Sequence, residues 1–83
     1  MELLEILNFI RANKGQSPIV ELKSGLSLRE EIGFDSLDLA ELTVRIEERY
    51  GVDVFADGLV YTVGEIEEKI TRGKAAETGE ERR

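Results

Sequence analysis

Apolar residues recur every three or four positions in three stretches of this chain, which is the spacing of a helix face. Each set would form the buried side of an amphipathic helix, and no two stretches alternate apolar and polar residues as paired strands would. The three sets are Leu3, Leu4, Ile6, Leu7 and Ile10; Leu39, Leu42, Ile46 and Tyr50; and Val63, Ile66 and Ile70. In a chain of 83 residues this pattern predicts an all-α fold, a single small helical bundle.

The expected ends of these helices carry residues that start or stop a helix. Gly15 and Gly51 follow the first two apolar sets, and glycine readily adopts the left-handed conformation that ends a helix. The second helix would begin at Asp35 or Ser36, with the aspartate as its cap. Residues 62–65 read Thr-Val-Gly-Glu, a capping box that would begin the last helix.

The remaining segments complete the predicted architecture. A long first loop spans roughly residues 16–34, and the capping-box spacing at residues 27–30 predicts a single helical turn within it. Residues 57–61 are predicted to form a brief third helix. The expected fold is therefore a small four-helix bundle over residues 1–72, with three longer helices and one short one. Residues 73–83 carry no bulky apolar side chain and are expected to form a flexible tail.

The chain has neither cysteine nor histidine, which excludes most chemistry of its own. Disulfides, thiolate nucleophiles, Cys/His zinc sites and Ser-His-Asp triads are all impossible. Asp35, Asp38 and Glu41 have helix spacing, which is not that of a calcium loop, so no metal site is expected. A serine without a neighbouring base is not an activated nucleophile, so the chain is not expected to be an enzyme. The lack of cysteine gives no sign of an oxidising compartment and favours a cytoplasmic location.

The formal net charge of −7 constrains the partners. Such a surface repels nucleic acid and anionic lipid, and it suits proteins with basic docking patches. No apolar run approaches the roughly 20 residues that a membrane span needs. The N-terminus, Met1-Glu2, lacks the basic flank of a secretory signal. The chain is expected to be a monomer with protein partners, without nucleic acid and without a membrane span.

Ser36 lies between two aspartates at the expected first turn of the second helix, in the sequence Gly-Phe-Asp-Ser-Leu-Asp. A group attached there would have a rigid root and an exposed position, and the start of a helix favours a bound phosphate. The alternative is that Ser36 is an ordinary helix-start residue, since serine is common at such positions.

The chain resembles the acyl carrier protein family around this serine. Residues 27–42 are similar to the core stretch of the family, residues 47–54 to the end of its second helix, and residues 62–66 to the start of its last helix. The resemblance implies a covalent 4'-phosphopantetheine arm on Ser36, whose thiol would carry an acyl or aminoacyl group as a thioester. It also implies that Asp35 lies beside the magnesium used when a phosphopantetheinyl transferase installs the arm.

The second helix also presents a candidate docking face for partner enzymes. Leu37, Glu41, Val44 and Glu48 follow one another at helical intervals on a side that differs from the core stripe. Aspartates beside the serine would meet basic side chains on partners. The predicted docking face therefore consists of Leu37, Asp38, Glu41, Val44 and Glu48. The alternative is a solvated helix side, in which Leu37 and Val44 half-cover the core.

Departures from the family pattern suggest a specialised carrier. Arg45 and Arg49 place positive charge where housekeeping fatty-acid carriers usually have none, and the segment before Thr62 nearly lacks acid and has Phe55 where proline is frequent. The preferred interpretation is a stand-alone carrier of a dedicated pathway, served by a phosphopantetheinyl transferase, an acyl- or aminoacyl-loading ligase and an acyltransferase or synthase. The alternatives are a housekeeping fatty-acid or polyketide synthase carrier, or a helical adaptor that is never modified.

Overall fold

Three helices account for the regular structure of the protein, in a computed structural model that describes the backbone of residues 2–56 and 58–81 and the side chains up to residue 73. The helices are α1 (Leu3–Asn13), α2 (Ser36–Tyr50) and α3 (Val63–Glu81). Within these residues there is no strand, only an isolated antiparallel bridge between Ser27 and Thr62. The predicted all-α fold is confirmed.

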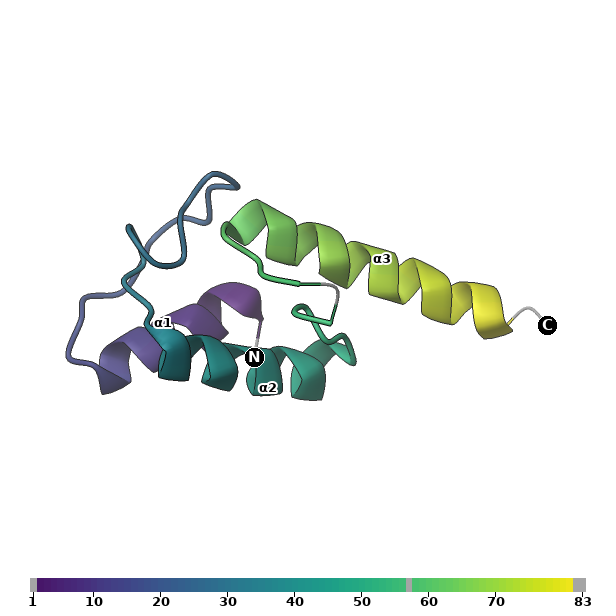
Figure 1. Cartoon of the computed structure of the whole chain (residues 1–83), viewed down its shortest axis with the longest axis horizontal. Coiled ribbons are helices and arrows are strands. Elements are labelled where there is room, and N and C mark those ends of the chain that lie inside the picture. Colours follow the sequence, from purple (N-terminus) through teal and green to yellow (C-terminus); the bar gives the residue numbers. More distant parts are fainter. Residues whose placement is uncertain (1, 57, 82–83) are drawn as a thin grey trace.

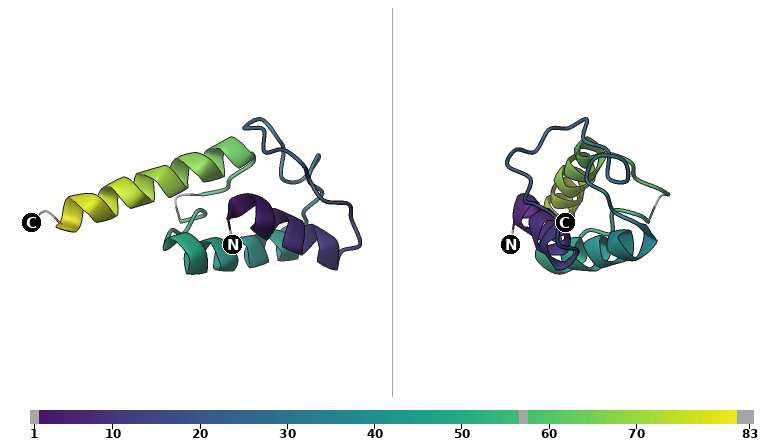
Figure 2. Two further views of the ribbon diagram at one scale, coloured as in Figure 1. Left: turned by 180° about the vertical axis from the view of Figure 1, so that it is seen from behind. Right: turned by 90° about the vertical axis from the view of Figure 1, so that its left-hand side faces the viewer.

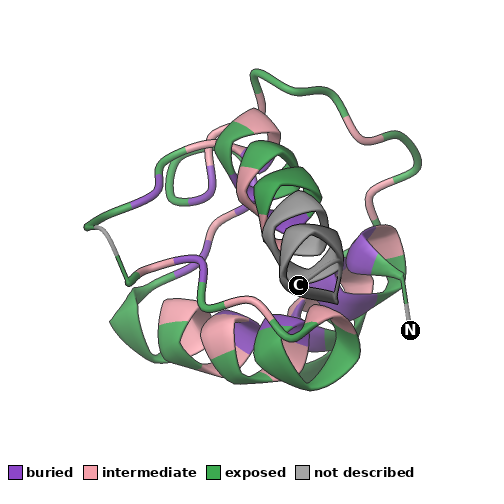
Figure 3. Cartoon of the chain, turned by 90° about the vertical axis from the view of Figure 1, so that its right-hand side faces the viewer, coloured by how far each residue is buried: buried purple, intermediate pink, exposed green. Residues whose placement is uncertain are grey.

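α1 packs against α2, and α3 lies across this pair with its C-terminal part extending past the other two helices (Figures 1 and 2). The predicted apolar stripes form the core: Leu42 and Ile46 of α2 are buried, and Leu39 and Tyr50 are partly buried at its edge. Figure 3 shows the buried positions on the inner sides of the helices and the exposed positions on the outer sides. The buried residues from the other helices are Leu3, Ile6, Leu7 and Ile10 of α1 and Val63, Ile66 and Ile70 of α3.

The long loop between α1 and α2 supplies much of the core and is held from both sides. Leu28, Ile32 and Phe34 are each at most 2% exposed. Backbone hydrogen bonds join the loop to the start of α3, with Leu28 N–H donating to the Tyr61 carbonyl at 2.9 Å and Val63 N–H donating to the Leu26 carbonyl at 3.0 Å. The loop therefore packs as a fixed layer over the helix pair, because its backbone groups have partners and its apolar side chains are buried.

On the α1 side, Asn8 and Arg11 hold the same loop. The Asn8 side chain donates to the Ile19 carbonyl at 2.9 Å and accepts from the Ile19 N–H at 2.6 Å. The Arg11 guanidinium donates to the carbonyls of Ser17 and Ile32. Two half-buried polar residues of α1 thus provide hydrogen-bond partners for loop backbone groups that lie outside any helix or strand.

The predicted short helix at residues 57–61 is wrong for residues 58–61, and Asp57 lies outside the described residues. Gly58 has φ +130°, which no helix residue adopts, and its N–H donates to the Phe55 carbonyl at 3.2 Å to close a turn. The residues that follow continue in non-helical backbone, in which Val60 is buried. These residues are held in non-helical backbone because Val60 packs in the core and the Tyr61 carbonyl accepts a hydrogen bond from the first loop.

Two further predictions concern the first loop and the C-terminal end. The turn at Ser27 is present: its hydroxyl accepts from Glu30 N–H at 3.1 Å, but the reciprocal acid is Glu31, which accepts from Ser27 N–H at 2.7 Å. α3 continues to Glu81, through most of the segment expected to be a flexible tail. The flexibility itself stays a prediction, and residues 82–83 lie outside the described part of the chain.

Candidate functional site

Ser36 is the first residue of α2 and is exposed. The backbone on which it stands is locked by its neighbours: the Asp35 carboxylate accepts from Asp38 N–H at 3.0 Å, and the Asp38 carboxylate accepts from Asp35 N–H at 3.0 Å. This reciprocal capping box satisfies donors that the start of a helix leaves unpaired. A group attached to Ser36 would consequently have a root of defined position.

The two residues before Asp35 fix the position at which α2 begins. Gly33 has φ +84°, in the left-handed region that favours glycine, and a Cβ there would lie 3.3 Å from the Gln16 side-chain nitrogen. Phe34 follows with its ring buried, and its N–H donates to the Leu28 carbonyl at 2.9 Å. The turn and the buried ring fix Asp35 and Ser36 at the surface.

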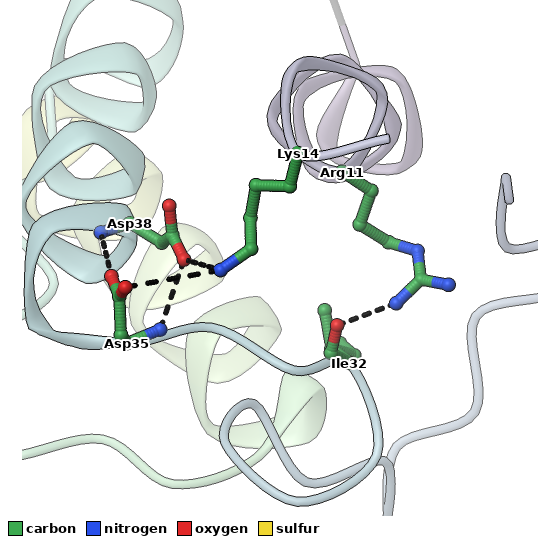
Figure 4. Close-up of polar contacts among 5 residues, drawn as sticks. All are labelled: Arg11, Lys14, Ile32, Asp35 and Asp38. Atoms are coloured by element: carbon green, nitrogen blue, oxygen red, sulfur yellow. Dashed lines mark hydrogen bonds and ion pairs between the residues drawn. The ribbon is translucent and has the colours of Figure 1, made fainter. Parts of the chain in front are cut away.

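Lys14, at the end of α1, joins the capping pair in space (Figure 4). Its Nζ lies 2.5 Å from Asp38 Oδ2 and 3.9 Å from Asp35 Oδ2. Burial works to raise the pKa of Asp38, but hydrogen bonds from Lys14 and from Asp35 outweigh it and hold that pKa below its ordinary value. The hydrogen bond to Asp38 raises the pKa of Lys14. Both partners are therefore charged at neutral pH.

The sequence analysis did not predict this contact. Lys14 and Asp38 are 24 positions apart, so no local spacing links them. The available signal was a lysine that follows one helix and an acidic pair that begins the next, in a fold that packs the two helices together.

An apolar groove of about 550 Å³ opens beside Ser36. α2 contributes Ser36, Leu39, Ala40 and Thr43 to its wall. The loop and the segment after α2 contribute Arg29, Phe55, Gly58 and Leu59. Arg29 is the only charged residue among these described lining residues. An exposed hydroxyl at a helix start, next to a groove with one cation, fits a negatively charged phosphodiester followed by a largely uncharged arm.

The predicted docking residues divide into two groups. Leu37 is 82% exposed and Val44 is 53% exposed, so neither covers the core. Glu48 is also exposed and has no ion-pair partner in the described part of the chain. The other two acids are engaged: Asp38 with Lys14, and Glu41 with Arg45, whose Nε lies 2.8 Å from Glu41 Oε2. Their assignment to partner docking stays a prediction.

Over the same described residues, no group of three acids is placed to hold a metal ion. None of the helices there combines the length and the apolar character that crossing a membrane requires.

A family model described as a phosphopantetheine attachment site matches residues 17–70, from the long loop to Ile70 of α3. The matched region is more than half of the 83 residues, and Ser36 with its capping pair lies inside it. No curated protein and no solved structure matches the chain. The chain belongs to the phosphopantetheine attachment-site family, which carries 4'-phosphopantetheine covalently, and it is a non-catalytic carrier protein of the acyl carrier protein type.

Proposed function

We propose that Ser36 is the residue that receives 4'-phosphopantetheine. The supporting observation is its position: an exposed hydroxyl on the first residue of a helix whose start is held by Asp35, Asp38 and Lys14. In the attachment step, Ser36 Oγ bonds to the phosphorus of coenzyme A that bears the pantetheine, the hydroxyl proton leaves, and the adenosine bisphosphate portion departs. When bound, the arm supplies the thiol that this cysteine-free chain lacks.

The residues around Ser36 have separate roles in this proposal. Asp35 is 63% exposed beside the serine, so it can approach the magnesium that the transferase uses. Arg29, across the groove, balances the charge of the phosphodiester. The apolar wall that includes Leu39 and Phe55 gives the arm and its cargo a surface to lie against.

Mass spectrometry of the intact protein tests the assignment. Apo-protein is incubated with a broad-specificity phosphopantetheinyl transferase, coenzyme A and magnesium, and its mass should rise by one phosphopantetheine. Ser36→Ala should abolish the gain and keep its helicity, whereas Ser17→Ala, a change at another exposed serine, should leave the gain intact. Modification of Ser36→Ala contradicts the assignment of the arm to Ser36. No modification of the parent by several transferases contradicts the proposal and favours an unmodified adaptor.

The carrier is further proposed to serve a dedicated pathway, in which a loading ligase attaches an acyl or aminoacyl group and an acyltransferase or synthase receives it. Two features support this specialisation. α2 carries Arg45 and Arg49. The exposed residues Leu59 and Tyr61 are apolar, and they lie where a housekeeping carrier would have an acidic helix. Arginines brought against the basic docking patch of a housekeeping synthase repel it, which lowers the affinity of the synthase for this carrier.

A reconstituted type II fatty-acid synthase tests the pathway. The holo-protein is offered beside that system's own carrier, at equal concentration and low salt. Slow malonyl loading and slow elongation are expected, with partial recovery in the Arg45→Ala/Arg49→Glu variant. Elongation as fast as with the housekeeping carrier would support the housekeeping alternative.

A further inference from the structure

Asp38, one of the acids predicted to meet partner enzymes, is occupied within the chain (Figure 4). Its Oδ2 accepts from Lys14 Nζ at 2.5 Å and from Asp35 N–H at 3.0 Å, and only 13% of its side chain is exposed. A basic residue of a partner would have to displace Lys14 before it reached this carboxylate. The gain in electrostatic energy would then be the difference between two similar ion pairs, which is small.

Glu41 also has an ion-pair partner within the chain, Arg45, which lies one turn further along α2. Arg45 donates from Nε to Glu41 Oε2 at 2.8 Å, and its guanidinium carbon lies 4.3 Å from the centre of the Phe9 ring on α1. Arg45 is therefore held by an acid on its own helix and by an aromatic face on the neighbouring one. A partner that used Glu41 would have to remove Arg45 from both.

A third ion pair, between Arg49 and Glu2, lies on the side of α2 that faces α1. Arg49 donates to Glu2 Oε2 at 2.6 Å, which ties the end of α2 to the start of α1. Asp38, Arg45 and Arg49 are seven and four positions apart, so they lie along the flank of α2 that faces α1. Of the predicted docking face, the residues that stay exposed and without an ion-pair partner in the described part of the chain are the apolar Leu37 and Val44, followed by Glu48.

We propose that Lys14 and Arg45 are built-in counter-ions that select the partner. The docking face then fits an enzyme that buries Leu37 and Val44 in an apolar depression and places no lysine or arginine against Asp38 or Glu41. Binding depends on apolar burial and only weakly on salt, and enzymes that recruit carriers through basic patches are disfavoured. This inference rests on the proposed function, since it concerns enzymes that act on the arm at Ser36.

The salt dependence of arm attachment tests the counter-ions. The kcat/KM of a phosphopantetheinyl transferase with a basic carrier-binding surface is measured from low to high NaCl. The parent should show a shallow dependence. Lys14→Gln/Arg45→Gln frees both acids and should react roughly tenfold faster than the parent at low salt, with a steep decline as salt rises.

The matched control is Lys23→Gln/Arg72→Gln, which changes the net charge equally. Lys23 is exposed in the long loop, and Arg72 pairs with Glu68 on α3 at 3.5 Å, four positions apart as in the Glu41–Arg45 pair. This control should follow the parent. The charge-conserving Lys14→Arg/Arg45→Lys variant should restore the shallow dependence, which separates charge from a loss of structure.

A second pair of variants tests the apolar contact. Leu37→Ala/Val44→Ala should lower kcat/KM roughly tenfold or more at every salt concentration, because contacts at the centre of an interface contribute most of its binding energy. Val20→Ala removes an apolar side chain that is 91% exposed in the long loop, and it should have no effect.

The outcomes separate the two proposals. A parent that is never modified overturns the assignment of Ser36. A parent that is modified, but with the same salt dependence in Lys14→Gln/Arg45→Gln as in the control, overturns the inference and leaves the assignment in place. If the double variant does not fold by circular dichroism, Arg45→Gln alone decides, because it leaves the Lys14 contact intact and should still steepen the salt dependence.

Discussion

Gly64, the second residue of α3, lies so close to Ser24 that a Cβ atom on the glycine would come within 2.9 Å of the serine Cβ and carbonyl oxygen. The Gly64 N–H donates to that same carbonyl at 2.8 Å. The glycine therefore allows the long loop to pack directly on the start of the helix. Its role is a close approach of two backbones, since its φ is not in the left-handed region.

Gly64→Ala is expected to lower the free energy of unfolding by about 1–3 kcal/mol, as overpacking does. In an unobstructed helix the same change would raise stability by up to about 1 kcal/mol, so the sign of the effect is informative. Gly25→Ala is the control, because a Cβ there would meet nothing within 4 Å. Urea denaturation measures both, and a stabilised Gly64→Ala would contradict the packing described here.

Leu42→Ala is expected to cost about 2–5 kcal/mol, since Leu42 is 0% exposed at the centre of the core. Leu37→Ala, on the outer side of the same helix and 82% exposed, should change stability by no more than about 0.5 kcal/mol. The comparison holds helix propensity constant, because both variants replace leucine with alanine in α2. Equal losses in chemical denaturation would show that the register of α2 is wrong.

Tyr50→Phe should lower stability by about 1 kcal/mol. The phenolic oxygen accepts from Leu3 N–H at 2.9 Å and donates to the Glu2 carboxylate at 3.1 Å, so its removal leaves the Leu3 N–H at the start of α1 without this partner. Tyr61→Phe removes a hydroxyl from a side chain that is 57% exposed and should be neutral. Thermal unfolding of the two variants beside the parent distinguishes these expectations.

The Lys14–Asp38 pair should make stability depend on acid pH. The folded-state pKa of Asp38 lies below the ordinary value of 3.8, so the folded state releases the proton more readily than the unfolded state. The contribution of the pair is present above that ordinary value and is lost as pH falls through the folded-state pKa. The stability advantage of the parent over Asp38→Asn should consequently be largest near neutral pH and shrink in acid.

A double-mutant cycle isolates this effect from other carboxylates. Lys14→Gln, Asp38→Asn and their combination are unfolded with urea at neutral pH and at a pH below the folded-state pKa of Asp38. A coupling that favours the parent pair is expected at neutral pH and should vanish in acid. A coupling that does not change with pH would show that the two side chains do not interact as an ion pair.

The features that the sequence predicted correctly all depend on residues close together in the chain. The apolar stripes of α1, α2 and α3 follow from a repeat of three or four residues, and the start of α2 follows from Asp35 and Asp38, three positions apart. Ser36 could be placed at an exposed helix start for the same reason. A helix and its caps are decided mostly by neighbours within one turn.

Tertiary contacts decided the rest. Residues 58–61 do not form the predicted helix, because Val60 is buried and the Tyr61 carbonyl accepts from the distant Leu28 N–H. Only the packing of α1 beside α2 brings Lys14 to Asp38 and Phe9 to Arg45, and these contacts determine which acids of the docking face are available. Each joins residues that are far apart along the chain, and local spacing carries no information about partners that chain folding alone brings together.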